Sequence, residues 1–79
     1  MAIEYRKKTA VFQGLVGVDE AEGLLEWLQK KPGAKVHLAD CTHMHPANLQ
    51  VLIVARPDIV SWPEAKGFRA WIEPVLKQS

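Results

Sequence analysis

The chain has little of what several specialised classes of protein need. Its 79 residues include one cysteine, so an internal disulfide is excluded and a reducing compartment is the simplest setting. No apolar run approaches the roughly 18 residues of a membrane-spanning helix. Residues 1–5 also lack the charged and then apolar regions of a signal peptide. We therefore expect a cytoplasmic protein without membrane insertion.

The chain also lacks an excess of charge of either sign. Ten basic residues nearly balance nine acidic ones, and the formal net charge is +1, so nucleic acid is not favoured as a partner. The single basic cluster, Arg6-Lys7-Lys8, is typical of a solvated strand end. A chain of this length forms one small domain, residues 1–79, which buries only about 60% of the surface that its unfolded chain exposes.

Strand and helix patterns alternate along the chain. We expect strand material over residues 3–16, a helix over 19–31, a strand over 36–39, a helix over 46–55, a strand over 58–60 and a helix from Ser61 or Trp62. Whether residues 3–16 form a hairpin that turns at Lys7-Lys8 or one bent strand stays open. The alternation predicts a small α/β fold of order β-β-α-β-α-β-α. Its four-stranded sheet would be mixed or mostly parallel, with the helices mainly on one face.

Local signals place the ends and faces of these helices. Asp19 and Ser61 are each followed three residues later by glutamate, which predicts a capping box at the start of the first and last helices. In the last helix, Trp71 falls on the apolar face and is predicted to lie in the core. Trp62, next to a helix start, is the tryptophan that we expect to be most exposed.

The most informative segment runs from Val36 to Leu52. It reads as an apolar strand, a polar turn with two histidines and the only cysteine, and a helix opened by Pro46. Proline is favoured at the first position of a helix. Polar side chains between a buried strand and a helix N-terminus are common at the functional sites of small α/β domains.

Three segments resemble the STAS family, the sulfate-transporter and anti-sigma-factor-antagonist domain. They are Phe12–Val16, Ala21–Leu28 and Val36–Leu52. Family members show a V-x-L-D-L-S strand and then an I-D-S-x-G-L-x-x-L turn and helix. In this chain His45 takes the aspartate place, Pro46 the serine place and Asn48 the glycine place.

The resemblance implies a non-catalytic bacterial regulatory module without a cofactor. Family members bind a protein partner, commonly an anti-sigma factor with kinase activity, and phosphorylation of the serine at the start of the second helix releases them. Pro46 has no hydroxyl, so this chain lacks that phosphorylation site. Thr42 is the nearest candidate phosphosite. A subunit of a transport or signalling assembly would also fit a domain without the serine.

We therefore expect partner binding through the turn and the start of the second helix. The predicted contact residues are His43, His45, Pro46, Ala47 and Asn48. An exposed sheet face or edge strand makes a homodimer a further candidate.

Two other interpretations of the same segment stay open. Cys41, His43 and His45 have the residue types of a zinc or copper site, and alternate side chains of an extended turn point the same way. The alternative function is therefore a small metal-binding protein. A cysteine–histidine nucleophile with Asp40 as the orienting carboxylate would require an exposed Cys41. We expect a non-enzyme, with Cys41 buried at the end of the strand, His45 capping the second helix or packing, and His43 facing solvent or the partner.

Overall fold

The computed structural model describes residues 2–77 and forms a four-stranded sheet with three α-helices. The elements are β1 (Ile3–Tyr5), β2 (Thr9–Val16), the 3₁₀ turn η1 (Val18–Glu20), α1 (Ala21–Lys30), β3 (Lys35–Met44), α2 (Pro46–Ala55), β4 (Asp58–Ser61) and α3 (Lys66–Lys77). The predicted α/β class and element order are confirmed, and residues 3–16 form a hairpin.

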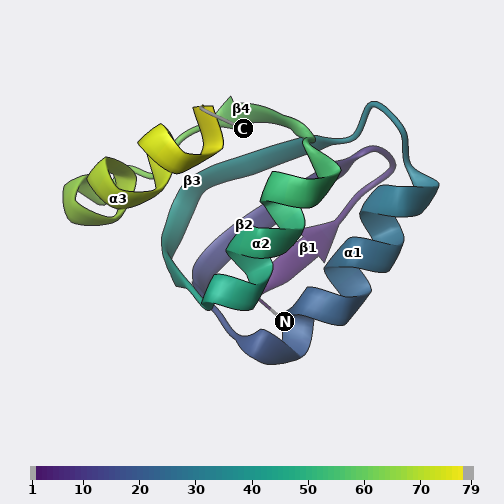
Figure 1. Ribbon diagram of the computed structural model, residues 1–79, viewed down its shortest axis with the longest axis horizontal. Coiled ribbons are helices and arrows are strands. Elements are labelled where there is room, and N and C mark those ends of the chain that lie inside the picture. Colours follow the sequence, from purple (N-terminus) through teal and green to yellow (C-terminus); the bar gives the residue numbers. More distant parts are fainter. Residues whose placement is uncertain (1, 78–79) are drawn as a thin grey trace.

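The sheet is mixed, as predicted. Its strand order is β1-β2-β3-β4, with β1 antiparallel to β2 and the other neighbours parallel. Figure 1 shows α1 and α2 side by side on one face of the sheet, and α3 set apart from them beyond β3. Short helical crossovers connect the parallel strands, as such pairing requires.

The core lies between that face of the sheet and the pair α1–α2. Phe12, Val36 and Leu38 point from the strands into it, and Leu24 and Leu52 meet them from the helices. The opposite face of the sheet, here called the open face, carries Thr9, Val11, Gln13 and His37, which are exposed or half-buried. The residues between them in β2, Ala10 and Phe12, are fully buried, as the two-residue period of a strand requires.

Both capping-box predictions are wrong. Asp19 lies inside η1, so Glu20 takes the N-cap position of α1 and no side chain caps that helix. Ser61 belongs to β4, and α3 begins only at Lys66. In both places the residues after the expected cap form a further turn or loop before the α-helix starts.

The strand predicted over residues 36–39 is longer in the structure and ends at Met44. Cys41, Thr42 and His43 therefore lie in β3 and not in a turn. Two irregularities interrupt its pairing with β2. From the pair Val11–His37 to the pair Gln13–Asp40, β2 adds two residues and β3 adds three. From the pair Gly14–Cys41 to the pair Leu15–His43, β2 adds one residue and β3 adds two. Each extra residue is a β-bulge, which changes the face to which later side chains point.

Helix α3 contributes few side chains to the core. Only Phe68 and Ile72 are buried, whereas Trp71 is 47% exposed. The prediction that Trp71 lies in the core is wrong, because α3 lies at the end of the sheet and the molecule is too small to cover its whole apolar face. Trp62, expected to be the most exposed tryptophan, is half-buried.

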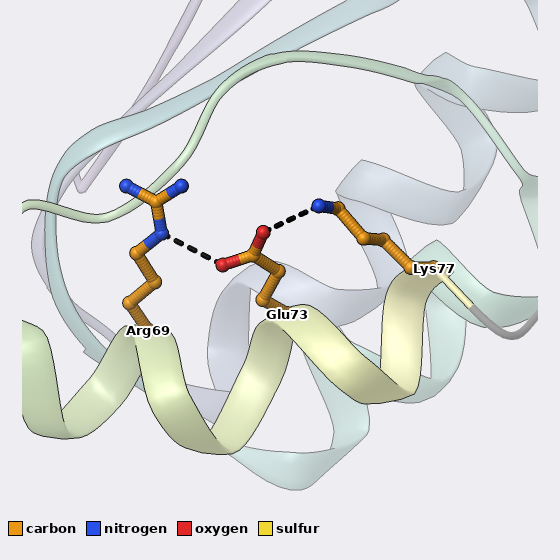
Figure 2. Close-up of polar contacts among 3 residues, drawn as sticks. All are labelled: Arg69, Glu73 and Lys77. Carbon is orange, nitrogen blue, oxygen red and sulfur yellow. Dashed lines mark hydrogen bonds and ion pairs between the residues drawn. The ribbon is translucent and has the colours of Figure 1, made fainter.

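Ion pairs stabilise the solvent side of α3. Glu73 accepts from Arg69 Nε at 2.7 Å and from Lys77 Nζ at 2.6 Å, so one carboxylate links three successive turns (Figure 2). The hydrogen bonds from Arg69 and then Lys77 lower the pKa of Glu73 to about 2. Lys77 also lies 5.5 Å from the ring centroid of Trp62, a cation–π contact between the end of α3 and the loop that precedes it.

Candidate functional site

The start of α2 is built as the sequence predicts. Pro46 is the first helical residue, and His45 is the N-cap, with its Nδ1 accepting from the backbone N–H of Ala47 at 3.0 Å. An acceptor at this position satisfies one of the N–H groups that a helix N-terminus leaves unpaired. Of the two roles expected for His45, capping and packing, the structure shows the cap, which requires an Nδ1 without a proton.

The remaining N–H groups of the first turn are also bonded. Asn48 N and Leu49 N donate to the carbonyl of His45 at 2.9 and 3.4 Å, and Pro46 has no N–H. A helix N-terminus binds phosphate through free N–H groups that point at the ligand. In this helix none of the first four residues offers one.

Asn48 does not lie on the surface, so its prediction as a contact residue is wrong. Its side chain is fully buried, and Nδ2 donates to the carbonyls of Gly17 at 2.8 Å and Val16 at 3.3 Å. The amide therefore fastens the start of α2 to the end of β2. A buried polar side chain needs such partners, and glycine at this position, the residue of the STAS pattern, would have no amide to supply them.

The other predicted contact residues are accessible. His43, His45 and Pro46 are exposed, and Ala47 is partly exposed. Thr42, the candidate phosphosite, is exposed on β3. These residues lie at the carboxyl ends of the parallel strands, which is where α/β sheets commonly bind their ligands.

The structure also exposes apolar side chains that the sequence does not single out. Leu15 is 64% and Val18 56% exposed. Leu15 is the register partner of His43, and the ring of His43 lies 6.1 Å from that of Phe68, on which Trp71 stacks at 6.0 Å. Val18 follows Gly17, which Asn48 holds against α2. We call the surface formed by Leu15, Val18, His43, His45, Pro46 and Trp71 the carboxyl-edge surface.

The predicted metal ligands do not converge. Cys41 is buried and donates its S–H to the carbonyl of His43 at 3.4 Å, whereas the rings of His43 and His45 face outward. The bulge at Thr42 is the reason, because it places Cys41 and His43 on opposite sides of β3. Within residues 2–77, no three His, Cys, Asp or Glu side chains form a group that could hold a metal ion.

Cys41 is not an activated thiol. Burial raises the pKa of Cys41 to about 11. A nucleophilic cysteine needs an accessible thiolate, stabilised by a neighbouring cation or helix N-terminus. The expectation that Cys41 is a small buried side chain is confirmed.

No protein-family model and no curated protein matches the chain. Among the helices of residues 2–77, none has both the length and the apolarity needed to cross a membrane.

Proposed function

We propose that the protein is a non-catalytic interaction module that resembles an anti-sigma factor antagonist and binds a protein partner through the carboxyl-edge surface. The observation that carries this proposal is the exposure of Leu15, Val18 and Trp71: Leu15 pairs with His43, Trp71 stacks on Phe68 next to the ring of His43, and Val18 follows Gly17, which is bonded to Asn48 of α2. Exposed apolar side chains that gather at one end of a small domain are typical of interaction sites. The observed element order and the mixed sheet are those of a small α/β domain.

The structure of the first turn supports binding without the usual phosphorylation switch. Pro46 supplies no hydroxyl, and the N–H groups of the turn are bonded to His45. A phosphate at this position would find neither a covalent attachment point nor free donors. The partner class that we propose is a cytoplasmic anti-sigma factor with kinase activity, or a subunit of a transport or signalling assembly.

A matched pair of valine substitutions tests the surface. Val18 lies in the carboxyl-edge surface, whereas Val54, 66% exposed, lies near the other end of α2. The partner to try is the purified anti-sigma kinase, transporter domain or chemoreceptor encoded next to the gene. We expect Val18→Glu to weaken its affinity at least about tenfold, or ~1.4 kcal/mol, and Val54→Glu to leave it unchanged. Equal affinities for the two variants would refute the proposed surface.

The lost switch is tested separately. Incubation with the partner kinase and ATP, followed by mass spectrometry, should leave the protein unmodified. Phosphate on Thr42 would show that the switch has moved from the helix to β3. A Thr42→Val control would then establish whether that phosphate controls partner release.

A further inference from the structure

The open face of the sheet contains a hollow that the proposed docking function does not use. Its volume is about 380 Å³, and Val11 and Ala39 supply the apolar part of its lining. The rest of the lining comes from the polar side chains of Arg6, Thr9, Gln13, His37, Asp40 and Ser61. Small-molecule sites have volumes of roughly 300–1,000 Å³ and hold a few well-placed polar groups, so this hollow fits a small ligand.

A bulge in β4 orients two of these side chains. His37 pairs with Ser61 whereas Val36 pairs with Ile59, so Val60 is the extra residue and Ser61 lies on the open face. Ser61 Oγ accepts from the backbone N–H of Ala39 at 3.3 Å and lies 3.4 Å from Nδ1 of His37. The hydroxyl can therefore donate to Nδ1, which places the ring proton on Nε2 as a further donor.

The charges of the hollow lie at different places along β2, one at its amino end and one near its middle. The backbone N–H of Arg6 donates to the carbonyl of Thr9 at 2.7 Å, so the guanidinium belongs to the amino end of the strand. Glu4 contacts its Nε at 3.1 Å, which leaves the two terminal nitrogens for a ligand. Asp40 is the register partner of Gln13. Four residues of strand, roughly 13 Å, separate Thr9 from Gln13.

We propose that this hollow binds a small zwitterionic metabolite. The carboxylate of the ligand pairs with Arg6 and its ammonium group with Asp40, while His37 and Ser61 donate to or accept from the polar atoms between them. The side chains of Arg6 and Asp40 occupy part of the span between the two ends. A ligand whose two charges are well separated therefore fits better than a compact α-amino acid.

Amide NMR spectra with 6-aminohexanoate as the probe test the proposal. We expect saturable shifts of the amides in Thr9–Gln13 and His37–Asp40. Hexanoate and hexylamine, which each lack one charge, should bind about tenfold more weakly. Arg6→Gln and Asp40→Asn should each weaken the binding of 6-aminohexanoate to a similar degree. Arg69→Gln, a matched change on α3, should leave its affinity unchanged.

Several outcomes would overturn the proposal. They are no saturable shift at tens of millimolar 6-aminohexanoate, binding of hexanoate or hexylamine as tight as that of 6-aminohexanoate, or unchanged affinity in both the Arg6 and the Asp40 variants. Shifts of the same amides that depend on protein concentration alone would assign the open face to a second copy of the chain. No protein partner is needed, so the result is independent of the docking proposal.

Discussion

Replacing Asn48 by aspartate would test the junction on which the carboxyl-edge surface depends. The substitution keeps the size of the side chain and removes its two donors. Nδ2 of Asn48 lies 2.8 Å from the carbonyl oxygen of Gly17 and 3.3 Å from that of Val16. An ionised carboxylate would face both oxygens without a proton to donate. An uncompensated buried charge costs about 3–5 kcal/mol, a large part of the total stability of a domain of this size.

Asn48→Ala is the matched control, because it removes the same hydrogen bonds without adding a charge. Both carbonyls keep another donor: Val16 O accepts from His45 N at 2.8 Å, and Gly17 O from Glu20 N at 3.1 Å. Oδ1 of Asn48 has no hydrogen-bond partner among the described residues, so alanine also removes an unpaired buried acceptor. We expect this variant to lose about 1–3 kcal/mol, less than the aspartate variant.

The two variants should also differ in pH dependence. Burial and the facing carbonyls favour the protonated form of the introduced carboxyl, so its folded-state pKa rises above the unfolded value of about 3.9. The extra destabilisation is therefore smallest below about pH 3.9 and grows as the pH rises through the folded-state pKa. Urea unfolding followed by far-ultraviolet circular dichroism, in steps from pH 3.5 to 7, measures it. Equal losses for Asn48→Asp and Asn48→Ala at pH 7 would refute this account.

Three further predictions follow from single residues. His45→Ala should lower the free energy of unfolding by about 1 kcal/mol through loss of the cap on Ala47, whereas His45→Asp should preserve stability; urea unfolding of both measures this, and equal losses would contradict capping by His45. Cys41, with its pKa raised to about 11, should react with iodoacetamide at pH 8 at least about tenfold more slowly in the native than in the urea-unfolded protein, and equal rates would show that the thiol is accessible. Arg56 ends α2 with φ 52°, the left-handed region, so Arg56→Gly should raise thermal stability by about 1 kcal/mol; a lower melting temperature would contradict relief of backbone strain.

The sequence predicts the site where short-range chemistry decides the structure. A proline at the first position and an acceptor side chain before it define a helix start locally, and α2 has the predicted bounds of Pro46–Ala55. The prediction that Asn48 is exposed is wrong, because amide side chains are common on surfaces and the sequence gives no reason to expect burial here. Only the close approach of the β2 carbonyls makes a buried amide favourable there, and that approach depends on the tertiary fold.

Helix α3 shows a different limit. Phe68, Trp71, Ile72 and Val75 recur at helical spacing, but the spacing does not say how wide a surface the rest of the molecule offers. A 79-residue chain has too few elements to cover all of that face, and Trp71 and Val75 are left exposed. In a small domain, a helix with more apolar residues on one face than the rest of the chain can cover is thus a candidate contact surface.

The bulges in β3 explain why the metal interpretation looked reasonable from the sequence and is not favoured by the fold. Successive side chains of a strand point to alternate faces of the sheet, and each inserted residue reverses the face for the residues that follow. The buried residues of β3 are Val36, Leu38, Cys41 and Met44, so the spacing changes from two to three at each of the two irregularities. After the first bulge, Cys41 points toward the core. After the second, Met44 points toward the core and His43 points to the opposite face of the sheet. The three-residue spacing of Leu38, Cys41 and Met44 is visible in the sequence. It is compatible with a bulged strand or with a strand that ends before Cys41. Pairing with β2 through Met44 decides between them, and it separates the thiol in the core from the imidazole on the carboxyl-edge surface.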